Sequence, residues 1–242
     1  MTRWRSRLAA SNGAHIKLIG CYWPLLTYGI FSKASIANPQ DLKGKVMAIS
    51  SPGALPDLLA RAVLEKNDIP SSEVRFAIMG SDADRFRAVM AGVVDAAAAS
   101  TEFVPIAPAG VKLLVHAHDA VPNYVRLCLY ASGKTITQRR DLLVRFLAAQ
   151  MAGVRHALNN RDDAIRLAKE MTEAKVDDPR AAYIYDEVIR YAAVTPDMPI
   201  PMDKLAWMRE LLTRTGNLTK PLDITKLTDD GPRAKALELA GK

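Results

Sequence analysis

The stretch KVMAISSPGALPDLLARAVLEKNDI, residues 45–69, decides the fold class of this chain. It opens with a short apolar run at 45–50 that is typical of a buried strand, followed by a Ser/Pro/Gly turn. From 55 to 68, apolar residues recur every three or four positions, which predicts an amphipathic helix. A strand that leads through a tight turn into a helix is the repeating unit of α/β proteins.

The rest of the first half repeats this alternation. A second helical pattern at 83–92 lies between strand-like runs, so we expect a parallel α/β sheet. From residue 135 onward the periodicity is mostly helical, and we expect an irregular tail at 218–242. The other runs expected to be strands are 15–20, 27–33, 73–80, 94–100, 111–117 and 125–132, and the later helices are 135–173, with a break near Asn159, 178–192 and 202–215.

Length and charge limit the function classes. The 242 residues, about half of them apolar, suffice for one large domain or two small lobes with a real core. The net charge of +7 comes from basic residues that are interleaved with acidic ones, so no nucleic-acid-binding arm is predicted. Residues 1–14 are basic, but no apolar stretch of signal-peptide length follows them, and no run is long enough to span a membrane.

The two cysteines are far apart in the sequence. Cys21 and Cys128 each lie in an apolar, strand-like run, without CxxC or Cys/His spacing. This pattern signals neither a disulfide framework nor a zinc site. We therefore expect two buried thiols.

The turn after the 45–50 run has the composition of half a binding site. Ser50, Ser51 and Gly53 come at the carboxyl end of an expected strand, directly before a helix. Unpaired N–H groups at a helix start can donate hydrogen bonds to an anion or a polar group, and ligands of open α/β sheets bind at this edge. The turn contains neither GxxxxGK[ST] nor GxGxxG, and simple helix capping is the alternative interpretation.

Two phrases in this region resemble a known family. DLKGK at 41–45, followed by a strand, the SSPG turn and a DLLARAVLEK helix, is one of them. The other is DRFRAVMAGVVDAAAAS at 84–100. In this order they resemble the substrate-binding proteins of ABC importers, in the group that serves nitrate, sulfonates, taurine and thiamine-pyrimidine precursors.

The resemblance implies a periplasmic-binding-protein-like fold of type II, with two lobes joined by two hinge strands at 27–33 and 125–132. Residues 34–125 would form the complete second lobe, and 1–33 with 126–242 a partial, helix-rich first lobe that lacks the family's first strand-helix units. The expected function is capture of a small polar or anionic solute (a sulfonate, nitrate, an aromatic carboxylate or a pyrimidine) for a membrane permease. The implied protein is periplasmic and monomeric, has no cofactor and is not an enzyme.

The candidate solute contacts follow three expected strands. They are Ser50, Ser51, Gly53 and Ala54 in the turn, Ser100 and Thr101 after the DAAAAS run, and Tyr22 and Trp23 after the first strand. An aromatic side chain could cover a flat or small ligand, or it could simply plug the core under a loop. We interpret Glu102 as an exposed charge at a helix start rather than a contact.

Other chemistry has little support. His116 and His118 would share one face of a strand, but no third ligand lies at a suitable spacing, so we expect a surface pair and no metal site. We find no GxSxG, HExxH or Cys/His arrangement. Two alternatives stay open: an enzyme resembling the pyrimidine-precursor synthases, with Cys21 as its candidate residue, and the ligand-sensing domain of a LysR-type regulator.

Overall fold

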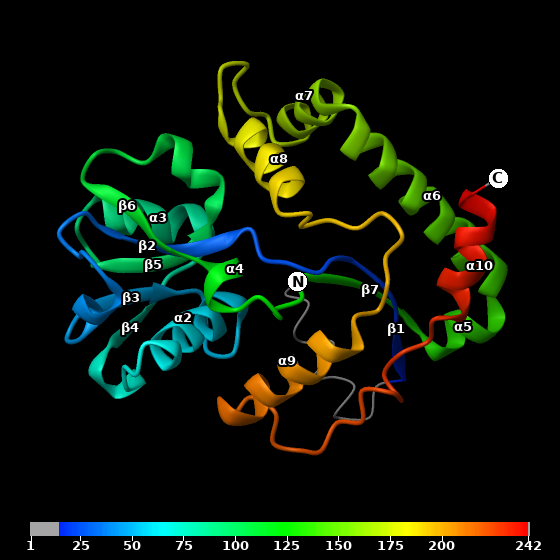
Figure 1. The fold of residues 1–242 in the computed structure, drawn as a ribbon, viewed down its shortest axis with the longest axis horizontal. Helices are drawn as coiled ribbons and strands as arrows, with labels where there is room; N and C mark the ends of the chain where they lie inside the picture. The colour runs from blue at the N-terminus through cyan, green and yellow to red at the C-terminus, as the bar shows by residue number, and fades with distance from the viewer. Residues whose placement is uncertain (1–14, 242) are drawn as a thin grey trace.

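Two β-sheets organise the chain, and the computed structural model describes residues 15–241 of it (Figure 1). One sheet has five strands in the order β4-β3-β5-β2-β6, and the other pairs β1 with β7. Each run expected to be a strand forms one, with small shifts at the ends. The strands are β1 (Ile16–Trp23), β2 (Tyr28–Lys33), β3 (Val46–Ile49), β4 (Arg75–Ile78), β5 (Ala96–Ser100), β6 (Val111–His116) and β7 (Leu127–Ser132).

The five-stranded sheet is mixed, so the expectation of a parallel sheet holds for β3, β4 and β5 but not for β2. β3 runs parallel to β4 and to β5, whereas β2 lies between β5 and β6 and runs antiparallel to both. The chain enters the sheet from β1 at the edge where β5 and β6 end, and β2 must therefore run in the opposite direction. Tyr28 at the start of β2 pairs with Ser100, and Gly29 pairs with His116.

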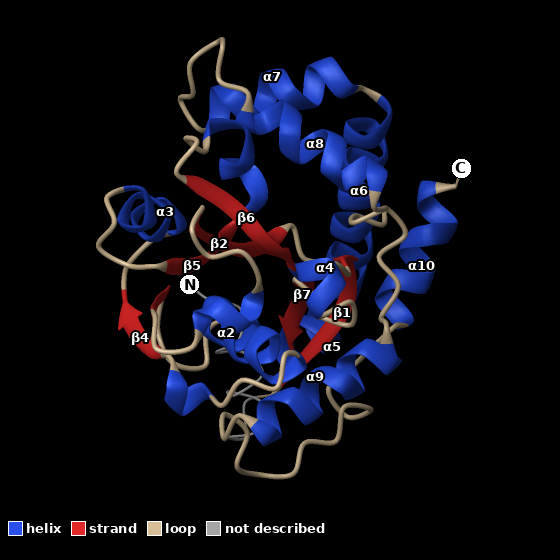
Figure 2. Cartoon of the chain, turned by 60° about the vertical axis from the view of Figure 1, so that its left-hand side comes forward, coloured by secondary structure: helices blue, strands red, loops and turns tan. Residues whose placement is uncertain are grey.

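The alanine-rich strand β5 lies at the centre of the sheet and is buried on both faces. Ala96 and Ala98 pack in one core cluster with helix α2 (Leu55–Lys66), and Ala97 and Ala99 pack in another with helix α3 (Asp82–Met90). The two helices therefore cover opposite faces (Figure 2). Small side chains at β5 allow both helices to approach the sheet closely.

β1 and β7 form an antiparallel pair outside the five-stranded sheet. A disulfide joins Cys21 of β1 to Cys128 of β7, so the expectation of two free thiols is wrong. Antiparallel pairing of the two strands brings cysteines that are 107 positions apart in the sequence to neighbouring places. Sequence spacing alone contains no information about that pairing.

The second half of the chain is helical, as expected, and helix α9 (Met202–Arg214) packs it against the sheet's helix α2. Leu205, Met208 and Leu211 of α9 share the core cluster of α2, so this cluster extends beyond the sheet's own helices. The segment 135–173, expected to be helical with a break near Asn159, contains two breaks. One helix ends at Asn159, as expected, and another break lies at Arg139. The helices are α5 (Gly133–Gln138), α6 (Arg140–Asn159), α7 (Arg161–Met171), α8 (Arg180–Arg190) and α9 (Met202–Arg214).

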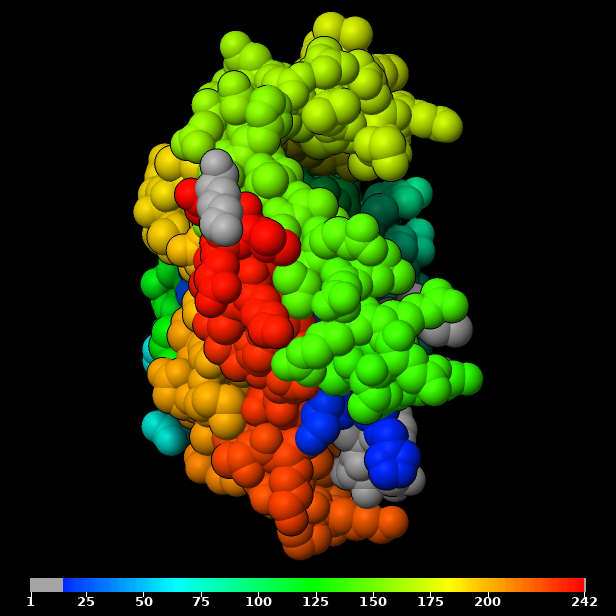
Figure 3. Space-filling view, turned by 90° about the vertical axis from the view of Figure 1, so that its right-hand side faces the viewer, coloured from blue at the N-terminus to red at the C-terminus, as the bar shows by residue number. Residues whose placement is uncertain are grey.

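The expectation of an irregular tail at 218–242 is wrong in part. Residues 231–240 form helix α10 (Gly231–Ala240), which lies along α6 (Figure 3). Pro232 suits the first turn of this helix, and Ala236 is fully buried in a core cluster with Leu147 and Met151 of α6. Within residues 15–241, none of the helices is both long and apolar enough to cross a membrane.

Short helical turns complete the fold between the strands. Two of them matter for the site because each directly follows a strand of the five-stranded sheet. They are η3 (Thr101–Ile106) after β5 and α4 (Ala117–Ala120) after β6; the others are η1 (Pro39–Leu42) and η2 (Ser71–Glu73).

Candidate functional site

The carboxyl ends of β3, β4, β5 and β6 lie at one edge of the five-stranded sheet, together with the start of β2. The pairing of Tyr28 with Ser100 and of Gly29 with His116 fixes this arrangement. Helix α8 packs against η3 at the same edge, and the chain crossing that contains Arg126 lies beside it. We call this region the carboxyl edge. It is where ligands of open α/β sheets bind.

The turn between β3 and α2 begins at the carboxyl edge. Gly53 has a φ of 73° and donates its N–H to the Asp57 carboxylate at 2.8 Å. Asp57 is buried and also pairs with Arg61, so this helix start already holds a carboxylate of its own. Ser50 is half-buried, Ser51 is exposed and Ala54 is buried. A ligand role for Ser50, Ser51, Gly53 and Ala54 stays a prediction.

The end of β5 supplies two hydroxyl groups. The Ser100 Oγ accepts the N–H of Glu102 at 3.5 Å, and the buried Thr101 hydroxyl donates to the Glu187 carboxylate of α8. Burial raises the pKa of Glu102, although the Arg180 charge acts in the opposite direction. Glu102 is half-buried rather than the exposed charge that we expected. A ligand role for Ser100 and Thr101 stays a prediction.

Tyr22 and Trp23, at the end of β1, line an apolar cavity of about 250 Å³ between β1 and the helices α6, α7 and α8. The indole Nε1 of Trp23 is buried and has no hydrogen-bond partner among the described residues. A buried donor without an acceptor is unfavourable, and a bound ligand can satisfy it. The other walls are Val154, Ala157, Leu158, Ala164, Ile165, Ala168, Ala181, Ile184, Tyr185, Val188 and Val194.

Arg126 brings a positive charge next to Trp23, one wall of this cavity. Its guanidinium lies 4.3 Å from the ring centroid of Trp23 and 5.3 Å from that of Tyr28, and it donates to Thr27 Oγ1 at 2.5 Å. The sequence reasoning did not single out Arg126. The available signal was a charged residue in the otherwise apolar run VRLCLYAS at 125–132.

A fixed polar network lies next to this cation. The Tyr28 hydroxyl donates to Asp82 Oδ2 at 2.5 Å, and Asp82 is paired with the buried guanidinium of Arg85. Arg85 also donates to the carbonyl oxygens of Ala98 at 2.8 Å and Gly80 at 2.6 Å. Burial and the Asp82 charge raise the pKa of Tyr28, so its hydroxyl stays protonated at neutral pH.

The histidine pair lies at the end of β6. His116 ends that strand and His118 is in α4, with 4.7 Å between the ring centroids. The expectation that no third potential ligand lies near them is wrong, because α8 places Glu187 beside both rings. Burial and the neighbouring His118 lower the pKa of His116. Burial raises the pKa of Glu187, although the hydrogen bond from Thr101 acts to lower it.

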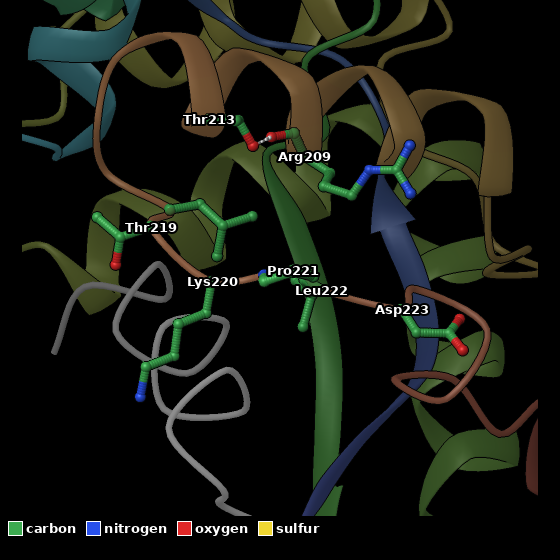
Figure 4. A pocket seen from close by; sticks show the side chains of 8 residues that line it. Arg209, Thr213, Thr219, Lys220, Pro221, Leu222 and Asp223 are labelled. Carbon is green, nitrogen blue, oxygen red and sulfur yellow. Dashed lines mark hydrogen bonds between the residues drawn. The ribbon is translucent and has the colours of Figure 1, made fainter.

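A separate pocket of about 590 Å³ lies at the end of α9 and in the loop that follows it (Figure 4). Arg209, Thr213 and Asp223 line it, and the Thr213 hydroxyl donates to the carbonyl oxygen of Arg209 at 2.9 Å. No residue of the carboxyl edge lines this pocket. It therefore does not belong to the candidate site.

Comparison with known proteins identifies the class. The fold is the α/β fold of type II periplasmic binding proteins, since it matches several of their solved structures over almost the whole chain. A family model described as NMT1/THI5 like matches residues 5–164, so the chain belongs to this family. A search of curated proteins finds no match.

Three solved structures illustrate the similarity. The aliphatic sulphonate-binding protein SsuA of Escherichia coli has a TM-score of 0.77 at 18% identity, over 93% of this chain and 73% of that chain. A ligand-binding component of an ABC-type import system from Staphylococcus aureus, with zinc bound, has a TM-score of 0.75 at 13% identity, over 96% and 78%. The desulfurization enzyme DSZB has a TM-score of 0.68 at 16% identity, over 93% and 80%.

Proposed function

We propose that this protein is the solute-binding component of an ABC importer and that its solute is a small organic anion with an apolar body, such as an alkanesulfonate. The observation that carries the proposal is the contact of Arg126 with Trp23, because Trp23 is also a wall of the apolar cavity. A cation and an apolar cavity that share one side chain suit the two ends of such a molecule.

Arg126 would bind the anionic group. A guanidinium presents several N–H donors in a plane and matches the oxygen atoms of a sulfonate or carboxylate. The buried Nε1 of Trp23 would donate to another oxygen of the same group. Hydroxyls at the carboxyl edge, including those of Ser50, Ser51 and Ser100, are further donors within the proposed site.

The cavity would take the apolar part of the solute. Its walls are aliphatic and aromatic side chains of α6, α7 and α8, together with Tyr22 and Trp23. A volume of about 250 Å³ is slightly below the usual range for small-molecule pockets and suits a short chain or a single ring. Inorganic nitrate, which has no apolar part, would leave this cavity unused.

Capture would involve relative movement of two lobes. One lobe would be built on the five-stranded sheet, with 34–125 as its main part, and the other on the β1-β7 pair with its helices. The strands expected as hinges at 27–33 and 125–132 pair within the two sheets as β2 and β7, so the crossings at 24–27 and 121–126 are the hinges in this proposal. Closure would exclude water and strengthen the hydrogen bonds to the solute. In the periplasm, the closed form would present the solute to a permease in the membrane.

An enzymatic function is the second candidate, because the desulfurization enzyme DSZB shares the fold. Cys21 was the residue expected to serve such an enzyme, and it is joined to Cys128 in a disulfide. A cysteine in a disulfide has no thiolate to act as a nucleophile. The disulfide therefore favours the binding function over a cysteine-dependent enzyme.

A thermal-unfolding series tests the proposal. We expect hexanesulfonate to raise the melting temperature of the wild-type protein, because a ligand that binds only the native state stabilises it by mass action. Inorganic sulfate, nitrate and an aminopyrimidine should give smaller shifts. The shift should be lost in Arg126→Gln and kept in Arg145→Gln, a matched change at an exposed position of α6. Equal shifts in both variants would contradict the role of Arg126.

A further inference from the structure

Three potential metal ligands converge where helix α8 meets the end of β6. His116 comes from β6, His118 from α4 and Glu187 from α8. One ligand atom from each of the three lies within 4.8 Å of the others. Among residues 15–241, this is the group of His, Cys, Asp and Glu side chains whose spacing could hold a metal ion.

Each of the three residues has a buried, unpartnered side-chain atom. His116 Nδ1, His118 Nδ1 and Glu187 Oε1 each lack a hydrogen-bond partner among the described residues. Leaving such a buried group unsatisfied is unfavourable, and buried polar side-chain atoms usually have partners. Each residue of this close group contributes one unpartnered atom, which favours a common explanation. A cation at their centre would satisfy all of them.

The geometry is close to that of a bound site. His116 Nδ1 lies 4.0 Å from Glu187 Oε1. Metal–ligand distances of about 2.0–2.2 Å place neighbouring ligand atoms roughly 3.3 Å apart in a tetrahedral zinc site. Small rotations of the three side chains would close this difference.

The surrounding groups already orient two of the three ligands. The other oxygen of Glu187 accepts the Thr101 hydroxyl, and His118 Nε2 lies 3.3 Å from Asp119 Oδ1. The ring of Tyr191 lies 4.1 Å from that of His118 and covers it. Metal-binding histidines commonly donate their second ring nitrogen to a carboxylate, which fixes the tautomer and the ring orientation.

We propose that His116, His118 and Glu187 bind a divalent transition-metal ion, with Zn²⁺ as the best match. Two imidazoles and one carboxylate suit zinc and its neighbours in the first transition row, whereas Mg²⁺ and Ca²⁺ prefer oxygen ligands throughout. Three protein ligands leave a fourth position for water or another small ligand. The ion would fasten α8 to β6 and α4 at the carboxyl edge.

The test uses the whole chain, purified after treatment with a chelator. Titration with zinc chloride, followed by calorimetry, should show one equivalent bound. His116→Gln, His118→Gln and Glu187→Gln should each weaken binding by more than about 100-fold, because loss of a supporting outer residue already costs 10–100-fold. His156→Gln is the matched control, since this histidine is exposed on α6 beside Asp163.

Two further readouts separate metal binding from a folding defect. Zinc should raise the melting temperature of the wild-type protein and of His156→Gln, but not of the three ligand variants. Cobalt(II) bound to the wild-type protein should show the visible absorption of a four- or five-coordinate ion. Absence of one-equivalent zinc binding by the wild-type chain would overturn the proposal. Undiminished binding in all three ligand variants, with circular dichroism confirming their fold, would also overturn it.

Discussion

Asn217 lies directly against Gly53. This contact connects the loop after α9 to the turn before α2. A β-carbon at position 53 would lie 2.9 Å from the Asn217 Cγ, closer than real contacts of this kind. Gly53 also has a φ of 73°, in the region that side chains disfavour. The turn that decides the fold class therefore fixes α2 against a residue far along the chain.

Substitution of Gly53 tests this contact. Gly44 also has a φ of 73°, but a β-carbon there would meet nothing within 4 Å. We expect Gly44→Ala to lower the free energy of unfolding by about 1–2 kcal/mol through the backbone alone. Gly53→Ala should cost about 1–3 kcal/mol more, because of the added clash. If urea denaturation shows the same loss in free energy of unfolding for both variants, the Asn217 side chain moves aside at no free-energy cost and the prediction is wrong.

The disulfide between Cys21 and Cys128 should contribute measurably to stability. It closes a loop of 107 positions between β1 and β7, and loss of such a cross-link typically costs about 2–4 kcal/mol. We expect dithiothreitol to lower the free energy of unfolding of the wild-type protein by this amount. The double variant Cys21→Ala, Cys128→Ala should not respond to the reductant, since the chain has two cysteines. The prediction is wrong if mass spectrometry shows that the wild-type protein contains the disulfide but its reduction leaves the free energy of unfolding unchanged.

Asp95 should make part of the stability depend on pH. Its carboxylate accepts the Lys33 ammonium at 2.7 Å and the Val46 N–H at 3.0 Å, and so connects β2, β3 and the start of β5. Burial alone would raise the pKa of Asp95, but these hydrogen bonds outweigh it and hold the pKa below the ordinary value of 3.8. A carboxyl group whose pKa is lower in the folded state than in the unfolded state stabilises the native state at pH values above its unfolded-state pKa. This contribution is lost as the pH falls through the folded-state pKa.

We therefore expect Asp95→Asn to lower the free energy of unfolding by about 1–3 kcal/mol at pH 7. The difference from the wild-type protein should shrink below pH 4, as the wild-type carboxyl is protonated. Asp162→Asn, at an exposed position of α7, is the control and should show no such trend. A difference that stays constant from pH 7 to pH 3 would exclude the carboxylate as its source.

The strands and most helices were predictable because their signals are local. Apolar runs such as 45–50 and 94–100 indicate strands without knowledge of their neighbours. Helix α10 was missed because its residues form no clear apolar stripe, and its stability comes from packing on α6 through Ala236. The direction of β2 and the disulfide depend on strand pairing, which the sequence pattern does not contain.

The candidate site was predictable only at strand ends, and these include Tyr22 and Trp23 in the cavity wall. Ser50 and Ser100 could be placed at strand ends, and their ligand roles stay predictions. Arg126 and Glu187 could not be found from spacing. Arg126 contacts Trp23, more than a hundred positions away, and Glu187 reaches the histidines from α8. Residues of this kind become candidates only when tertiary contacts are known.

Calorimetric titration with hexanesulfonate tests the central claim most directly. The account predicts saturable binding of one molecule to the wild-type protein. Arg126→Gln should weaken this binding by about 10- to 150-fold, the equivalent of a hydrogen bond to a charged group, and Arg126→Lys should weaken it less. Filling the cavity with Ala164→Phe should weaken hexanesulfonate more than methanesulfonate. Wild-type protein that binds no organic anion, or an Arg126→Gln variant that binds hexanesulfonate as tightly as the wild type, would contradict the account.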